Sequence, residues 1–327
     1  MAETSIVPNE LNQIIQHAKN TFAAEINSET GSNTNDTLSD NLILSLRTLS
    51  SVATYLDTFL EAYPSATTQD NQDTVMDDAD SFDEEMDVEN TPSRMDATIL
   101  AELTASIPLI LQQQLSISVI PIALDAINDI GWTMTRVPEW DSWQEITNKV
   151  LEFAVPRIEG MVALGENTLS TFLGCIWATA KSSHRTFSLD ADDIQLLESL
   201  YGRYPTAEFQ AKIVGILGLA AQTESIETNK YITGFMMREI ASQAPLVVIE
   251  IMDSIMEIFA DGEKVYDIPV FVQGQVLAKL KELLPKLRKR IKGINLDKES
   301  ELRERGEDVL ENFVEFIKYK ETEAKQR

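Results

Sequence analysis

Residues 205–262 decide the fold class: PTAEFQAKIVGILGLAAQTESIETNKYITGFMMREIASQAPLVVIEIMDSIMEIFADG. The apolar residues in this stretch recur at intervals of three and four, which is the spacing of an α-helix buried on one face; they do not alternate as in a strand. Pro205, Pro245 and the pair Asp261-Gly262 supply start and stop signals for helices. The stretch therefore predicts three helices, at 205–221, 225–241 and 245–260.

The same spacing continues on both sides of this stretch and predicts an all-α protein. Further helices are expected at 8–26, 38–64, 96–112, 115–135, 139–157, 163–180, 190–202, 269–291 and 299–320. From residue 95 onward, antiparallel pairs begin roughly 35–51 residues apart, which brackets the ~40–47-residue period of HEAT and armadillo repeats. We expect a HEAT/armadillo-type α-solenoid of antiparallel helix pairs. Because no consensus string recurs between pairs, an irregular helical bundle is the structural alternative.

Residues 65–94 interrupt this pattern with a polar, acidic, low-complexity composition. Such a segment cannot bury enough apolar surface to offset the entropy of ordering, so we expect a long disordered acidic loop. The sequence thus predicts three regions: N-terminal helical repeat(s) at 1–64, the acidic loop at 65–94, and a repeat solenoid at 95–327.

The charge of the chain is unevenly distributed. The chain has 53 acidic and 27 basic residues, a net charge of -26. Residues 279–327 hold 14 basic and 11 acidic residues, whereas residues 1–278 hold 13 and 42. A surface of this kind repels a phosphate backbone and attracts basic proteins. We therefore expect basic protein partners and no direct contact with nucleic acid.

The first candidate binding site is the acidic loop, where residues 70–89 contain no Lys or Arg. Met76, Phe82 and Met86 lie among the carboxylates and give a partner apolar surface to desolvate; the alternative is a solubilising spacer. Thr74 and Ser81 resemble acidophilic kinase sites, and phosphorylation there would deepen the charge. The candidate client-binding residues are Asp70, Asp73, Asp77, Asp78, Asp80, Asp83, Glu84, Glu85, Asp87 and Glu89.

The second candidate is an aromatic cluster at a helix-helix corner. Its ordinary explanation is core packing, whereas partial exposure on the concave face of a solenoid would provide an anchor for an extended peptide. The basic run from Lys279 to Lys292 has the apolar spacing of an amphipathic helix and predicts a solvated basic face. The candidate groove residues are Trp132, Arg136, Glu139, Trp140 and Trp143.

The groups that an enzyme needs are scarce. His17 and His184 are the two histidines, Cys175 is the one cysteine, and no phosphate-loop, dinucleotide or nucleophile-elbow motif occurs. An EF-hand frame on Asp78 fails because Phe82 and Asp83 occupy a ligand position and the glycine position. We expect no catalytic activity, no metal and no cofactor. The single cysteine favours a reducing compartment, and no segment is apolar enough to enter a membrane.

The C-terminal segments resemble the symportin family of armadillo/HEAT import adaptors. The resemblance rests on the strings PVFVQG at 269–274, LLPKLRK at 283–289, ELRER at 301–305 and NFVEFIKYK at 312–320, and it extends more weakly over the whole chain, including an acidic loop before the HEAT repeats. It implies a non-enzymatic chaperone that accompanies basic ribosomal proteins of the 5S ribonucleoprotein particle into the nucleus. The acidic loop and the inner solenoid surface would then bind these clients.

Members of the symportin family are longer and carry an N-terminal importin-binding signal followed by armadillo repeats. This sequence has neither, so we expect a C-terminal fragment or a short form in which client binding is retained. Importin is a further expected partner whose binding signal is absent here. The resemblance implies shuttling between cytoplasm and nucleus. The alternative function is a general HEAT-repeat scaffold for protein partners, with the acidic loop as a spacer.

Overall fold

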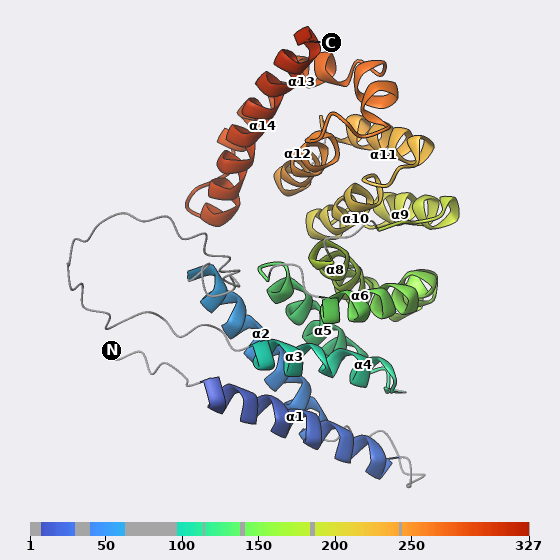
Figure 1. Cartoon of the computed structure of the whole chain (residues 1–327), viewed down its shortest axis with the longest axis vertical. Helices are drawn as coiled ribbons and strands as arrows, with labels where there is room; N and C mark the ends of the chain where they lie inside the picture. Colours follow the sequence, from blue (N-terminus) through green and yellow to red (C-terminus); the bar gives the residue numbers. More distant parts are fainter. Residues whose placement is uncertain are drawn as a thin grey trace, which may run out of the picture. The chain divides into compact units, whose positions relative to one another are not determined.

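The described part of the structure is entirely helical. This computed structural model describes residues 8–29, 40–62, 97–113, 115–137, 141–183, 187–241 and 244–326. Every regular element within these ranges is a helix (Figure 1). The predicted all-α fold class is therefore confirmed, and so is the repeated arrangement of helices. The predicted acidic loop at 65–94 lies outside the described residues.

The helices follow the predicted order closely along the chain. Their bounds are α1 Pro8–Glu29, α2 Asp40–Ala62, α3 Ala97–Thr104, α4 Ser106–Leu111, α5 Ile120–Met134, α6 Asp141–Ala154, α7 Ile158–Met161, α8 Glu166–Ser182, α9 Ala191–Arg203, α10 Ala207–Ala220, α11 Ile226–Glu239, α12 Pro245–Phe259, α13 Val276–Lys292 and α14 Ser300–Gln326. Short 3-10 helices η2 Val155–Arg157 and η3 Val162–Leu164 flank α7, and the π-helix η4 Asp267–Val272 precedes α13.

The chain divides into two compact units, Met1–Glu152 and Phe153–Arg327. The boundary between them falls within α6, and not at the stretch 65–94. This position follows from packing, because α2 lies before that stretch and packs against α5, which lies after it. The N-terminal helices and the helices of 97–152 therefore share one core.

In the first unit, α2 is the central helix and contacts both α1 and α5. Its apolar side joins the buried residues Leu46 and Leu49 to Ile15 and Phe22 of α1. On the other side, the Thr133 hydroxyl of α5 donates a hydrogen bond to the Ala53 carbonyl of α2 at 2.8 Å. Burial of these apolar faces supplies the main favourable free energy for the helix pair.

In the second unit, every other helix stacks on the next. α8 contacts α10, α10 contacts α12, and α12 contacts α14. The alternating helices α9 and α11 lie beside α10 and α12 on one side of this row (Figure 1). Helix pairs that each contact their neighbours in this way form the repeating pattern expected of a solenoid.

Local capping groups and a proline set the starts of three of these helices. The Asp190 carboxylate accepts a hydrogen bond from the Asp193 backbone amide at 2.8 Å and caps α9. The Ser225 hydroxyl accepts one from the Thr228 amide at 3.2 Å and caps α11. Pro245 occupies the first turn of α12, where its missing amide hydrogen has no cost.

The expected helix at 269–291 begins later than its pattern indicates. Residues 267–272 form a π-helix, and Gln275 has left-handed backbone angles, φ 54° and ψ 34°. A side-chain carbon at Gly274 would lie 2.2 Å from the Val270 carbonyl oxygen, so glycine is required at this turn. The turn starts a new helix at Val276. Apolar spacing alone does not reveal such a break.

Two other expected helices are interrupted near prolines. The segment 96–112 divides into α3 and α4 around Ala105. Pro108 lacks the amide hydrogen that would bond to the carbonyl of Thr104, which favours a break there. The expected helix at 139–157 ends as α6 at Ala154, just before Pro156, and Gly165 with φ 93° precedes α8.

Gly215 of α10 allows a close approach of α8. A side-chain carbon at this position would lie 2.2 Å from the Trp177 ring of α8.

We expect Gly215→Ala to lower the free energy of unfolding by about 1–3 kcal/mol, because the ring must move out of a packed position. Urea denaturation measures this loss. Gly202→Ala is the matched control, since no heavy atom lies within 4 Å of its added carbon; an equal loss in both variants would contradict the explanation.

Candidate functional site

Most residues of the two predicted sites lie outside the described part of the chain. These are the ten carboxylates between Asp70 and Glu89, together with Glu139 and Trp140 of the predicted groove. The structure describes the remaining groove residues, Trp132, Arg136 and Trp143. The predicted contact between a client and the acidic loop therefore stays a prediction.

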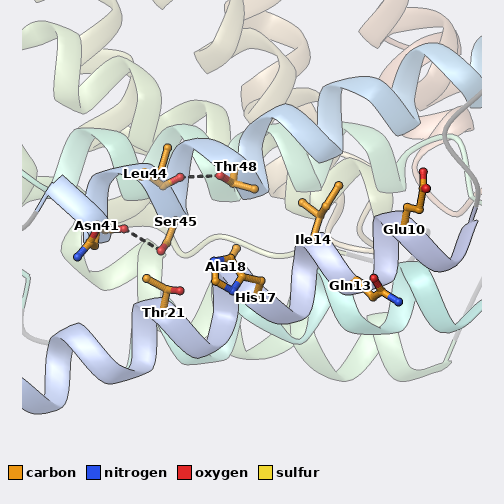
Figure 2. Close-up of a pocket in the computed structure, with 10 residues that line it drawn as sticks. All are labelled: Glu10, Gln13, Ile14, His17, Ala18, Thr21, Asn41, Leu44, Ser45 and Thr48. Carbon is orange, nitrogen blue, oxygen red and sulfur yellow. Dashed lines mark hydrogen bonds between the residues drawn. The ribbon is translucent and has the colours of Figure 1, made fainter. Parts of the chain in front are cut away.

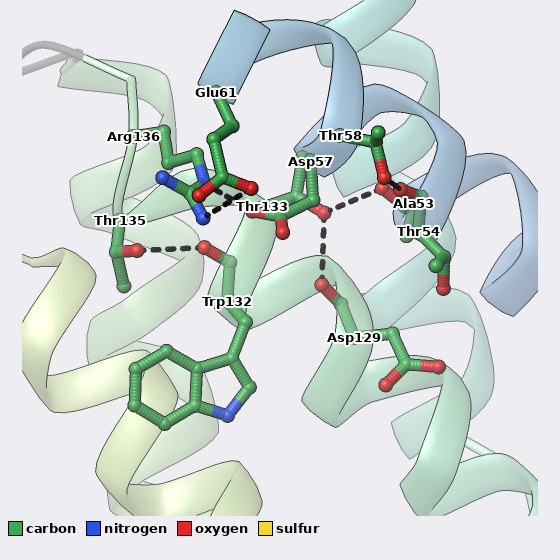
Figure 3. Close-up of polar contacts among 10 residues, drawn as sticks. All are labelled: Ala53, Thr54, Asp57, Thr58, Glu61, Asp129, Trp132, Thr133, Thr135 and Arg136. Atoms are coloured by element: carbon green, nitrogen blue, oxygen red, sulfur yellow. Dashed lines mark hydrogen bonds and ion pairs between the residues drawn. The ribbon is translucent and has the colours of Figure 1, made fainter. Parts of the chain in front are cut away.

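Arg136 follows α5 and is held by two carboxylates of α2 (Figure 3). Its Nε lies 2.6 Å from Asp57 Oδ1, and its Nη2 lies 3.4 Å from Glu61 Oε2. The hydrogen bond to Asp57 raises the pKa of the Arg136 guanidinium further above its ordinary value, and burial opposes this rise only partly. The pair joins the ends of α2 and α5. Arg136 thus has a structural role that its position in the sequence does not reveal.

The two described tryptophans of the predicted groove differ in exposure. Trp143 of α6 is buried, with 2% of its surface exposed, and belongs to the core. Trp132 of α5 is half-buried, and Figure 3 shows its indole directed away from the Arg136 guanidinium. The structure does not place Trp132 and Arg136 side chains against each other. Of the two tryptophans, Trp132 is the one with surface that a partner can reach.

An open groove of about 390 Å³ runs between α1 and α2 of the first unit (Figure 2). Ile14 and Leu44 are 38% and 64% exposed at its rim, and Ala18 and Ser45 lie deeper. Ile14 thus faces this groove and is not part of the core of the first unit. His17 also lines the groove, and within the described residues it makes no hydrogen bond or ion pair. The groove offers a surface for a side chain and no catalytic pair.

A row of carboxylates on α12 is the most unusual polar feature of the second unit. Glu250, Asp253 and Glu257 recur at helical spacing. Glu250 is buried, with 2% of its surface exposed, and accepts a hydrogen bond from Arg305 Nη2 of α14 at 2.7 Å. Burial raises the pKa of the Glu250 carboxyl, although the charges of Arg305 and Lys181 act in the opposite direction.

Lys181 of α8 reaches the same row from the other side. Its Nζ lies 3.3 Å from Glu257 Oε1, so an ion pair spans α10, which packs between α8 and α12. Burial by itself would lower the pKa of Lys181, but the charges of Glu257, Glu250 and Asp253 outweigh burial and raise it. The three carboxylates therefore act together on one cation.

Trp177 is a further partly exposed side chain of α8 on the side of Lys181. Trp177 lies one helical turn before Lys181 on α8 and is half-buried against Gly215. We call Trp177, Lys181, Glu250, Asp253, Glu257 and Arg305 the α12 carboxylate surface.

The raised pKa of Glu250 has a measurable consequence for stability. Because the folded state holds this proton more tightly than the unfolded state, the carboxyl contributes stability at low pH that is lost as the pH rises through its folded pKa. Glutamine has a similar shape and does not titrate. We therefore expect the free energy of unfolding of Glu250→Gln, relative to the unchanged chain, to increase as the pH rises above the ordinary pKa of 4.5.

Chemical denaturation across this pH range measures the difference between the two chains. Glu159→Gln removes one exposed carboxylate and is the control for the loss of a negative charge. A difference for Glu250→Gln that stays constant or decreases with pH would show that burial does not govern this carboxyl.

Sequence reasoning did not identify the α12 carboxylate surface. Its members come from three helices, and Glu250 and Arg305 are 55 residues apart. One local signal was available, namely three acidic residues at helical spacing in an otherwise apolar helix, PLVVIEIMDSIMEIF. Such a pattern indicates carboxylates on one side of a buried helix, but it does not reveal the cations that face them.

Within the described residues, no helix is long and apolar enough to cross a membrane. In the same part of the chain, no group of three or more His, Cys, Asp or Glu side chains is arranged to hold a metal ion. Cys175 of α8 is buried, and His184 lies outside the described residues.

Stacked helix pairs with polar and aromatic side chains on their surfaces define an α-helical repeat protein. The family described as "SYO1-like, TPR repeats" matches residues 138–324, which is more than half of the chain. The chain belongs to this family. The match confirms the resemblance to symportins that the C-terminal strings indicate.

Three relatives extend this finding. The chain is 28% identical over 213 residues to the armadillo repeat protein involved in nucleocytoplasmic transport Syo2 of Schizosaccharomyces pombe, covering 61% of this chain and 32% of that protein. It is 26% identical over 230 residues to symportin 1 of Chaetomium thermophilum, covering 62% and 34%. It is 30% identical over 169 residues to synchronized import protein 1 of Saccharomyces cerevisiae, covering 46% and 27%. The chain thus spans about a third of the length of these relatives.

Proposed function

We propose that this chain is a non-enzymatic adaptor of nucleocytoplasmic transport that binds basic ribosomal proteins of the 5S particle. The observation that carries the proposal is membership of the SYO1-like family, whose relatives are named for nucleocytoplasmic transport and synchronized import. The net charge of -26 supports a basic partner. The adaptor would accompany its clients during nuclear import and ribosome assembly, and would itself shuttle between cytoplasm and nucleus.

Two surfaces are proposed to bind the client. One is the acidic stretch 70–89, whose carboxylates would cover the Lys and Arg side chains with which the client later binds ribosomal RNA. The other is the α12 carboxylate surface, where a client cation can bind the exposed Glu257 in place of Lys181. Trp132 of the first unit, which is half-buried, remains a further proposed contact with the client. Importin is a proposed further partner.

A salt series tests the proposal against the alternative of a general scaffold. If carboxylates hold a basic client, its affinity should fall steeply as salt rises, because exposed ion pairs are screened. An interface with an apolar core would keep most of its affinity. The measurement is the Kd for a 5S-particle ribosomal protein by fluorescence anisotropy at low and high sodium chloride. A Kd that is unchanged by salt would favour the scaffold.

A further inference from the structure

The outer face of α13 carries a group of exposed cations in an otherwise acidic protein. Val276, Leu280, Leu287 and Ile291 are buried and form the inner face of the helix. The opposite side is basic and exposed, which confirms the solvated basic face that the apolar spacing predicts. We call Lys286, Arg288, Lys289 and Lys292 the α13 cation group.

The other basic residues of α13 have partners within the fold. Lys281 forms an ion pair with Glu321 of α14. Lys279 donates a hydrogen bond to the Gly274 carbonyl at 3.1 Å, and Arg290 donates one to the Ala241 carbonyl at 2.8 Å. By contrast, the four members of the α13 cation group form no ion pair or hydrogen bond through their side chains within the described residues. Acidic residues outnumber basic ones almost two to one in this chain.

The neighbouring helix makes this lack of pairing more informative. α14 runs antiparallel beside α13, since Lys281 pairs with Glu321 near one end and Arg303 donates to the Lys292 carbonyl near the other. The intervening part of α14 contains Glu304, Glu307, Asp308, Glu311 and Glu315. Lys281 pairs with Glu321 of α14, whereas within the described residues no side chain of the α13 cation group pairs with these carboxylates. Arg288 and Lys292 lie seven and eleven residues after Lys281 and therefore on the same side of α13, yet they form no such pair within the described residues.

Helix capping accounts for only part of the α13 cation group. Cations in the last turn of a helix are favoured by the helix dipole, which explains Lys289 and Lys292. Lys286 and Arg288 lie outside this turn. Several terminal carbonyls are already used: that of Lys292 accepts from Arg303 Nη1 at 2.5 Å, and those of Arg290 and Ile291 accept from the backbone amides of Gly293 and Ile294. A cluster of four cations at this place thus exceeds what the helix end requires.

We propose that the α13 cation group binds a short acidic segment of a partner protein. Arg and Lys side chains donate charge-assisted hydrogen bonds to carboxylates. Leu296, 62% exposed in the turn after α13, adds an apolar contact at one end. Electrostatic interactions between exposed charges are screened over about 8 Å at physiological salt. A short acidic segment therefore interacts mainly with the local positive charge. A nucleic acid long enough to extend over the rest of the surface would meet the net negative charge of residues 1–278.

This inference goes beyond the proposed function and does not depend on it, because it concerns an acidic partner at a surface other than those proposed for basic clients.

The probe is a fluorescent peptide in which Asp and Glu alternate with Gly, and its comparison is an RNA oligonucleotide of the same formal charge. Anisotropy at low salt measures both. The titration uses the full chain with the ten carboxylates of 70–89 changed to amides, so that this stretch cannot compete with the probe.

The test variant changes Lys286, Arg288, Lys289 and Lys292 to Gln. Its matched control changes Arg47, Lys230, Lys264 and Lys325 to Gln, four exposed cations elsewhere, so that both variants have the same net charge. We expect the peptide to bind and the test variant to lose affinity by about tenfold or more, as the loss of four ion pairs predicts, while the control keeps it.

Three results would overturn the proposal. They are no detectable binding of the peptide, an equal loss of affinity in the test and control variants, and tighter binding of the RNA than of the peptide. Because basic clients are proposed to bind elsewhere, the same four substitutions made in the chain with an unchanged stretch 70–89 should retain the Kd for a basic ribosomal protein, and this retention shows that the variant is folded.

Discussion

Lys320→Met is expected to destabilise the second unit by about 3–5 kcal/mol, the largest stability effect of the substitutions considered for this chain. Lys320 of α14 is buried, with 1% of its side chain exposed, and its Nζ lies 2.8 Å from Asp267 Oδ1 of η4. Asp267 is equally buried. Removal of the cation leaves a carboxylate in a low-dielectric interior without its counter-charge.

The surroundings of Lys320 explain why its loss should be so costly. Its ammonium also lies 2.9 Å from Glu323 Oε2 and 5.1 Å from the centre of the Phe271 ring. These contacts join α14 to the π-helix before α13, so the substitution affects packing between two elements. Thermal unfolding should show a midpoint lower by roughly 6–20 °C, given about 2–4 °C per kcal/mol for a unit of this size.

Two further variants separate loss of the ion pair from other effects. Lys318→Met removes a lysine of the same helix that is exposed and forms its ion pair with Glu315 in solvent. This substitution should lower the free energy of unfolding by less than about 1 kcal/mol. The double variant Lys320→Met with Asp267→Leu removes both charges and should be more stable than Lys320→Met alone. If the double variant were less stable than the single one, the unpaired carboxylate would not be the cause.

The largest expected effect on binding comes from the acidic stretch 70–89. Changing its ten carboxylates to Asn and Gln should weaken binding of a basic 5S-particle ribosomal protein by about 100-fold or more at low salt, because several ion pairs of up to ~1 kcal/mol each are lost. Isothermal titration with each chain measures this change.

A charge-matched control is needed, since the substitutions also change the net charge by ten. The control chain changes ten exposed carboxylates elsewhere: Glu10, Glu152, Glu159, Glu224, Glu263, Asp297, Glu299, Glu304, Asp308 and Glu311. It should lose far less affinity than the chain with the neutral stretch. An equal loss in both chains would mean that the client responds to net charge and does not contact residues 70–89.

The helix pairs could be predicted from the sequence because the period of apolar residues is local information. α9 to α12 begin and end within a few residues of their predicted bounds, where Asp190, Ser225 and Pro245 mark the starts. The break before α13 could not be predicted in this way. It depends on a π-helix and on the close contact between Gly274 and the Val270 carbonyl, which periodicity does not encode.

The candidate site could be predicted only in part. The charge runs are visible in the sequence, and so is the amphipathic pattern of α13. Which charges pair with each other depends on tertiary distances. Glu250 and Arg305, and likewise Asp267 and Lys320, are more than fifty residues apart and meet only because helices of the second unit stack. Burial of Trp143 and the ion pairs of Arg136 also follow from packing and not from a motif.

We propose that this member of the SYO1-like family binds basic ribosomal proteins of the 5S particle, and selectivity among basic proteins tests this proposal most directly. The measurement is the Kd of the unchanged chain for purified 5S-particle ribosomal proteins and, in the same buffer, for histone as an equally basic control. A much lower Kd for the ribosomal proteins is the predicted result, since charge alone would attract both. No binding, or equal affinity for histone, would contradict the claim.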